Sequence, residues 1–163
     1  MMEHRWYIWF RRACFVNAFI ALGWTFLLIL PFVPFSNALP IMEGGGPGQW
    51  LTVGYLLFVS VGIGLLGWLS AAIHTIEVGE GRELSVSLVF PGLGLLFLGV
   101  DTSCLSLGLA GALGGYQATL EMATTASLKD LLSPFVYPIS SMVFVAIAGS
   151  ILTLLAMIRA RGP

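Results

Sequence analysis

Four long runs without a charged side chain divide this sequence. No Asp, Glu, Lys or Arg occurs in residues 13–42, 44–76 or 131–158, and Asp101 is the only one in residues 84–120. A helix needs about 20 apolar residues to cross a hydrocarbon core of about 30 Å, and each run is long enough. The pattern therefore predicts an all-α chain, residues 1–163 forming a single transmembrane domain. Its spans are expected at about residues 13–32, 50–76, 85–113 and 134–158.

Composition agrees with this pattern and excludes other classes. The 163 residues are 58% hydrophobic and only 9% charged, whereas soluble domains carry roughly 25% charged residues. The net charge is −1 and no basic tail or stripe occurs, so nucleic acid is not an expected partner. The expected partner is the lipid bilayer, with other membrane subunits beside it.

The basic residues predict the orientation. With four spans, both termini share a side with the loop at residues 77–83, and that side holds six of the seven basic residues, with only Lys129 opposite. Basic residues in short loops favour the cytoplasmic side. We therefore expect a multi-pass protein of the cell membrane, an antiparallel four-helix bundle with both termini cytoplasmic. The first run exceeds the about 7–15 residues of a signal-peptide core, so we expect it to stay as a signal anchor.

Two boundaries are expected from local signals on the outer side. Gly114 and Gly115 are expected to end the third span. The polar segment at residues 117–132 is expected to leave the membrane, with a short helix at the interface and Ser127 as an N-cap.

Small residues recur at helical spacing on three of the spans, and on the second span they are Ser60, Gly64, Gly67 and Ala71. Small side chains let helix backbones approach closely in lipid, where the hydrophobic effect drives no association. Such faces either seal the bundle or receive helices of another subunit. The letters G-x-G-x-x-G at residues 62–67 match a dinucleotide fingerprint, but they lie in mid-span, so we interpret them as packing residues. The predicted packing residues are Gly64, Gly67, Gly108, Gly111 and Gly149.

Asp101 is the one ionisable residue far inside a span. A carboxylate at mid-membrane costs about 2.5–3.5 kcal/mol on insertion scales, so it must be protonated, paired or facing water. Counting depth from the helix ends places Ser60, Ser140 and Ser141 near its level, which makes Asp101, Ser60 and Ser141 a candidate polar site. The alternatives are a carboxyl group that locks packing or lies near the outer surface, a group that handles protons or ions, and a contact to a partner subunit. Asn17 is expected near the inner boundary, solvated or bonded to His74.

No catalytic, metal or cofactor site is predicted. A bis-histidine haem would need His4 and His74 on opposite sides of one pocket, and we do not expect this chain alone to bind haem. Neither an HExxH or CxxC motif nor a paired carboxylate site occurs on any span. Cys14 and Cys104 are expected to be small buried residues.

The sequence also resembles a known kind of protein in two stretches and a layout. Trp9-Phe10-Arg11-Arg12-Ala13, continuing to Ala21-Leu22-Gly23-Trp24, is similar to the start of small four-helix membrane proteins related to part of haem–copper oxidase subunit I. Gly67-Trp68-Leu69 ahead of His74, and the last span with its terminal arginines, fit the same layout. The histidine ligands of such oxidases have no matching set in this chain. The resemblance therefore implies membership of a respiratory assembly without oxidase catalysis.

Three functions are compared on these grounds. The leading hypothesis is a non-catalytic membrane subunit of a larger complex, respiratory or energy-converting. The alternative is a small oligomeric carrier or channel for protons or ions that uses Asp101. A quinone- or lipid-modifying enzyme is disfavoured because paired polar catalytic residues are missing.

Overall fold

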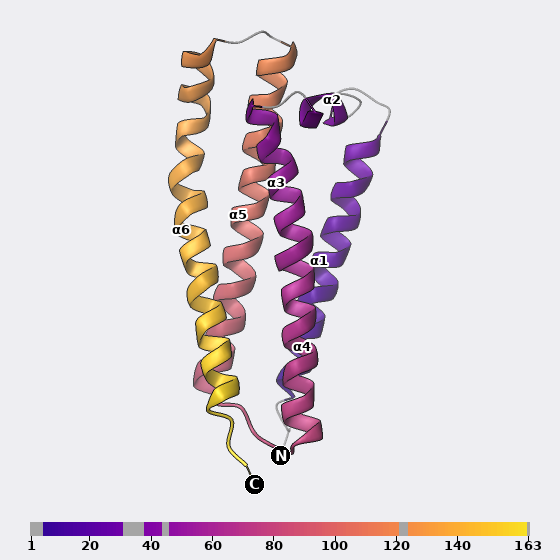
Figure 1. Cartoon of the computed structure of the whole chain (residues 1–163), viewed down its shortest axis with the longest axis vertical. Coiled ribbons are helices and arrows are strands. Elements are labelled where there is room, and N and C mark those ends of the chain that lie inside the picture. The colour runs from indigo at the N-terminus through magenta and orange to yellow at the C-terminus, as the bar shows by residue number, and fades with distance from the viewer. Residues whose placement is uncertain (1–4, 31–37, 44–45, 121–123, 163) are drawn as a thin grey trace.

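The fold consists of long helices that stand side by side (Figure 1). The computed structural model describes residues 5–30, 38–43, 46–120 and 124–162. Four helices are α-helical throughout: α1 (Trp6–Ile29), the short α2 (Ala38–Glu43), α5 (Val86–Leu120) and α6 (Thr125–Ile158). The second long helix is continuous but of mixed type: the 3-10 turn η2 (Gly46–Gly48), α3 (Gln49–Leu57), the π-helix η3 (Phe58–Leu65), α4 (Leu66–His74) and the π-helix η4 (Thr75–Gly79).

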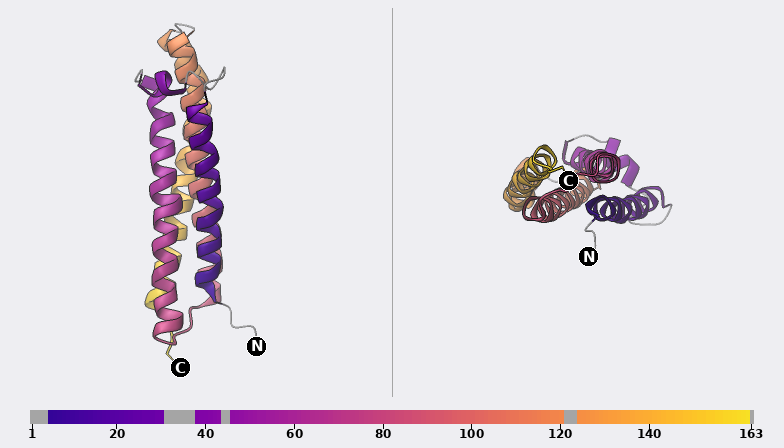
Figure 2. Two further views of the ribbon diagram at one scale, coloured as in Figure 1. Left: turned by 90° about the vertical axis from the view of Figure 1, so that its right-hand side faces the viewer. Right: turned by 90° about the horizontal axis from the view of Figure 1, so that it is seen from below.

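Four of these helices are long and apolar enough to cross a membrane. They cover Trp6–Ile29, Gly46–Gly79, Val86–Thr119 and Ala126–Ile158. Within the described residues no strand occurs, and the one β-bridge joins Glu83 to Arg161. The predicted all-α class with four candidate spans is confirmed. The first and the last described parts of the chain lie at the same end of the molecule (Figures 1 and 2).

The C-terminal end of α5 and the N-terminal end of α6 differ from the prediction. The third helix does not end at Gly114-Gly115 but continues to Leu120, and α6 already begins at Thr125. The expected separate interfacial helix is therefore wrong. Gly114 does not end the helix but permits a close contact within it, since a Cβ at this position would lie 2.8 Å from the Pro47 Cβ. The N-cap of α6 is Thr124, whose hydroxyl accepts from the Ser127 N–H at 3.3 Å.

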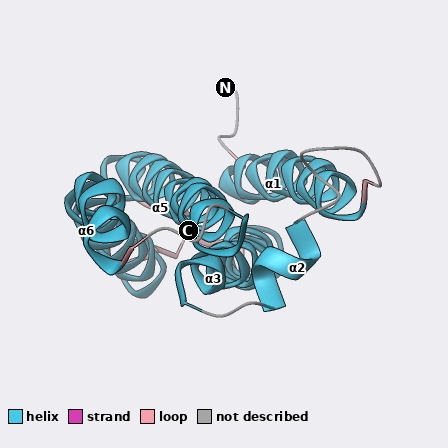
Figure 3. Ribbon diagram, turned by 90° about the horizontal axis from the view of Figure 1, so that it is seen from above, coloured by secondary structure: helices cyan, strands magenta, loops and turns pink. Residues whose placement is uncertain are grey.

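The helices are arranged so that α5 is central and α6 and α1 lie at the two sides. α5 packs along α6 and also against α3, while α1 packs against η3 and α4. The view along the helices shows α6 and α1 at opposite ends of the group (Figure 3). The second long helix thus changes its main neighbour along its length, from α5 at α3 to α1 at α4. The π-helix η3 lies where this change occurs.

A short pattern repeats on the second and third long helices. Gly62-Ile63-Gly64-Leu65-Leu66 recurs as Gly92-Leu93-Gly94-Leu95-Leu96, and burial follows the same order in both: buried, half-buried, exposed, half-buried, buried. The first glycine admits a neighbouring helix in each case. A Cβ on Gly62 would lie 3.1 Å from Asn17 Nδ2 of α1, and one on Gly92 would lie 2.6 Å from Thr153 Oγ1 of α6. The repeat supports the interpretation of the first G-x-G as packing.

Candidate functional site

A buried polar cluster joins three of the four spans. Asn17 of α1 is fully buried, and its Nδ2 donates to the Gly62 carbonyl of η3 at 2.9 Å and to Asp101 Oδ1 of α5 at 3.0 Å. Asp101 is only 9% exposed. These buried contacts link the three helices, and no water would compete for them if the helices cross a membrane.

The position of the cluster follows from the local backbone. The π-helix η3 departs from the i→i−4 hydrogen-bond pattern, and such segments are common at functional sites. Gly62 lies inside this segment and has no side chain, so the Asn17 amide can reach its carbonyl. One residue on, the Ile63 carbonyl accepts from Cys14 Sγ at 3.4 Å. The π-helix therefore offers two successive carbonyl oxygens to α1.

The cluster contains a buried acceptor without a partner. Both Asn17 amide hydrogens are used in the two bonds described above, and Asn17 Oδ1 is buried without a hydrogen-bond partner among the described residues. No Lys, Arg or His in the described part of the chain pairs with Asp101. Chemically, the cluster is a carboxyl group and an amide oxygen in an apolar setting, which suits a proton donor or a small hydrogen-bonding molecule.

The structure corrects the predicted partners of Asp101. The Ser60 hydroxyl is exposed and donates to Leu56 O of its own helix at 2.7 Å, and the Ser141 hydroxyl donates to Pro138 O at 3.0 Å. Asn17 was expected near the inner boundary, solvated or bonded to His74. It lies deep instead, because α1 begins at Trp6 and Asn17 is therefore about three turns into the helix.

Polar contacts tie α1 to the second long helix at several other depths. The Ser70 hydroxyl of α4 donates to Tyr7 O at 3.0 Å. Near the other end of the helices, Thr25 Oγ1 and the Tyr55 hydroxyl lie 2.6 Å apart. None of these pairs is charged. They are the kind of contact that organises helices in lipid.

The predicted packing glycines divide into two groups. A Cβ on Gly108 would meet the Trp24 ring, one on Gly111 would meet the backbone of Leu51, and one on Gly149 would meet the backbone of Leu96. Gly67 is less crowded, since its Cβ would lie 3.6 Å from Cys14 Sγ.

Gly64 was expected in a tight helix contact but faces outward. A Cβ there would meet only Val59 O of its own helix, at 3.8 Å. Ser60 and Ala71, which share the predicted small-residue face, are exposed as well. None of the described residues covers the face of the second long helix that carries them.

The predicted lack of a metal or haem site remains a prediction. His74 is exposed and its ring lies edge-on to Tyr7 at 4.7 Å between centroids, whereas His4 lies outside the described residues. The described residues contain no group of three or more His, Cys, Asp or Glu side chains placed to hold a metal ion.

Interactions at the terminal end of the molecule were not anticipated from the sequence. The Glu77 carboxylate accepts from the Trp6 and Tyr7 N–H groups at 3.1 and 3.3 Å and so caps α1. Arg82 donates to Ala160 O through Nε and Nη2, at 3.2 and 2.6 Å. The backbones of Glu83 and Arg161 exchange two hydrogen bonds, at 2.9 and 3.0 Å. The only available signal was the presence of charged residues near three helix ends.

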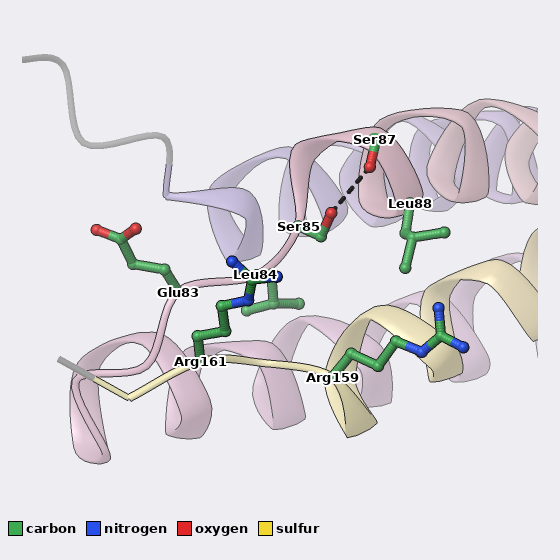
Figure 4. A pocket seen from close by; sticks show the side chains of 7 residues that line it. All are labelled: Glu83, Leu84, Ser85, Ser87, Leu88, Arg159 and Arg161. Atoms are coloured by element: carbon green, nitrogen blue, oxygen red, sulfur yellow. Dashed lines mark hydrogen bonds between the residues drawn. The ribbon is translucent and has the colours of Figure 1, made fainter.

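Two grooves open at this end. The larger, of about 650 Å³, lies between the start of α5 and the chain that follows α6 (Figure 4). The smaller, of about 350 Å³, lies between α1 and α4. Because its walls include Gly67 and Ala71, the smaller groove adjoins the uncovered face of the second long helix. Its other lining residues are Tyr7, Arg11, Cys14, Ser70 and His74.

Comparison of the chain with protein families, with characterised proteins and with solved structures finds no match.

Proposed function

We propose that this chain is a non-catalytic integral membrane subunit of a larger complex. The observation that carries the proposal is the uncovered small-residue face formed by Ser60, Gly64 and Ala71 on the second long helix. Gly64 has space around it that a close-packed helix would fill. Small residues lose little by facing lipid but gain much from a neighbouring backbone, so the face suits a helix of another subunit.

The rest of the structure supports a scaffold rather than a catalyst. The polar side chains within the spans bond mainly to backbone carbonyl groups, and the buried cluster centres on an amide–carboxyl pair. Neither of the two described grooves includes Asp101. The respiratory or energy-converting kind of complex is proposed from the sequence resemblance alone.

The proposal includes an orientation. The four spans form one antiparallel bundle in the cell membrane, and both termini face the cytoplasm. The excess of basic residues at the terminal end supports this side assignment.

The decisive experiment is extraction in mild detergent followed by native mass measurement of the wild type and two variants. Gly64→Leu should release the partner subunits, because the larger side chain fills the contact. Gly94→Leu is the matched control, since Gly94 holds the corresponding exposed position of the repeated pattern on α5 and has nothing within 4 Å of a Cβ. It should keep the partners. A wild-type protein that runs as a lone chain, or a Gly64→Leu variant that keeps every partner, would overturn the proposal.

A second function is favoured by one observation, the unpartnered Asn17 Oδ1 beside Asp101. A carboxyl group and a free acceptor are what a proton- or ion-carrying oligomer would need. Asp101→Asn separates the two functions. Asparagine keeps the shape and still accepts from Asn17, so a scaffold should retain normal complex yield, whereas a carrier would lose flux in proteoliposomes because asparagine cannot titrate. We expect normal yield and no flux difference.

A further inference from the structure

The larger groove at the terminal end is lined by two groups of opposite character. Leu84 and Leu88 give it an apolar side, and Leu84 is almost completely buried. Ser85 and Ser87 bring hydroxyls from the start of α5, with their oxygens 2.9 Å apart. Arg159 and Arg161 bring guanidinium groups from the chain that leaves α6 (Figure 4). The groove thus combines apolar and cationic side chains, and the Arg159 side chain extends along it in the direction of the spans (Figure 4).

The two guanidinium groups have unused hydrogen-bonding capacity. Neither side chain makes a hydrogen bond or ion pair with a described residue, although the Arg161 backbone is engaged in the bridge to Glu83. A guanidinium group carries five donors in a planar fork, which matches the oxygens of a phosphate. In contrast, Arg82 at the same end is bonded to Ala160 O and Glu80.

One acidic side chain also lines the groove. Glu83 opposes the binding of an anion, but its carboxylate points away from the Ser85 and Ser87 hydroxyls (Figure 4). Two arginines against one glutamate leave the groove with an excess positive charge.

We infer that this groove binds the phosphate headgroup of an anionic phospholipid. Arg159 and Arg161 would hold the phosphate, the serine hydroxyl hydrogen left over from the Ser85–Ser87 bond would be donated to it, and an acyl chain would leave along Leu88. A lipid is the occupant that matches both kinds of lining side chain, because free phosphate would use only the cationic ones. Basic pockets between membrane helices on the cytoplasmic side are known to hold such headgroups.

The test measures binding of phosphatidylglycerol to the purified full chain by native mass spectrometry, with phosphatidylcholine as the zwitterionic reference. We expect the Arg159→Gln/Arg161→Gln variant to bind phosphatidylglycerol at least about tenfold more weakly, since charge-assisted hydrogen bonds are lost. The Arg11→Gln/Arg12→Gln variant is the matched control. It removes the same charge from exposed arginines at the same end, outside this groove, and should change the affinity less than about threefold.

Two further arms fix the source of the phosphate and the integrity of the protein. Inorganic phosphate at the concentration of the lipid should not displace phosphatidylglycerol; displacement would overturn the lipid assignment. The Arg159/Arg161 variant should keep the wild-type thermal stability, because the bridge to Glu83 uses only the backbone of residue 161. Equal loss of affinity in both arginine variants, or equal binding of the two lipids by the wild type, would overturn the inference.

Discussion

At the residue scale, Asn17 contributes most to the buried polar structure. Its one side chain donates a hydrogen bond to η3 and another to α5. The sequence marked Asp101 as unusual because charge in a span is costly, but it gave no reason to pair it with Asn17. Depth counting gives the level of a residue and not its face, so Ser60 and Ser141 were equally plausible partners.

We predict that Asn17→Leu lowers the free energy of unfolding by about 1–3 kcal/mol, because it removes the donor from two buried acceptors. Asp101→Leu should cost less when Asn17→Leu is already present, with a coupling of about 0.6–1.7 kcal/mol. A double-mutant cycle measured by reversible unfolding in mixed micelles gives this value. Additivity within about 0.3–0.5 kcal/mol would show that the pair does not interact.

The packing glycines give a second prediction at this scale. Gly111→Ala should destabilise the chain by about 1–3 kcal/mol, because the new Cβ would collide with the backbone of Leu51. Gly64→Ala should change stability by less than about 0.5 kcal/mol, since the new Cβ would make only an ordinary contact with Val59 O, at 3.8 Å. Thermal unfolding of the purified chain in detergent compares the two. Similar losses for both variants would contradict the outward position of Gly64.

At the element scale, the helix ends at the terminal side are bonded to other elements. The N-cap residue of helix α1 is Arg5, whose side chain makes no capping hydrogen bond to the helix. The carboxylate of Glu77 in η4 caps the helix instead. A carboxylate is well placed there because the N-terminus of a helix carries partial positive charge. Sequence reasoning found the helices because they are long and apolar. It could not find this cap, because its two partners lie 71 residues apart.

Glu77→Ala should destabilise α1 by about 0.5–2 kcal/mol, the usual cost of losing an N-cap. Glu77→Gln keeps one acceptor and should lose less. Hydrogen exchange of the first-turn amides of α1 measures the effect locally. Glu80→Ala serves as the control, because Glu80 is exposed and pairs only with Arg82 of its own loop. Equal exchange in the Glu77→Ala and Glu80→Ala variants would exclude the cap.

At the scale of the whole molecule, the chain brings both described ends to the side that holds most of the basic residues. The number of spans and this shared side were predictable, because hydrophobic length and loop charge act independently of packing detail. The order of neighbours was not predictable. It depends on which faces of α3, α4 and α5 carry small residues. In both copies of the repeated Gly-x-Gly-Leu-Leu pattern the first glycine is buried and the second is exposed, so the presence of a glycine does not by itself tell which face is covered.

The orientation itself can be tested directly. Reporters fused after Pro163 and inserted after Glu43 should report opposite sides of the membrane, with the fusion at residue 163 on the cytoplasmic side. Alkaline phosphatase and a fluorescent protein, each placed at both positions, make the readings complementary. The same side for both positions would exclude the four-span arrangement.

The π-helix η3 has a consequence for insertions and deletions. Each residue turns an α-helix by about 100°, so a helix that contains an extra residue presents a rotated face beyond it. In the second long helix, this rotation brings Ser70 and Glu77 to α1 while Gly54 stays against α5. The segment therefore sets the rotation that lets one helix pack against α5 on one side of η3 and against α1 on the other.

Deleting the exposed Val59 should relax η3 toward a regular α-helix and turn everything beyond it out of phase, with loss of the Ser70 and Glu77 contacts to α1. Inserting one alanine after Ala72 in the deleted chain should restore the phase of Glu77 but not that of Ser70. Hydrogen exchange at the start of α1 would then recover its protection while α4 stays loosely packed. The deletion would thus remove only one residue and yet turn the side chains beyond it away from α1, and the insertion would turn back only those that follow it.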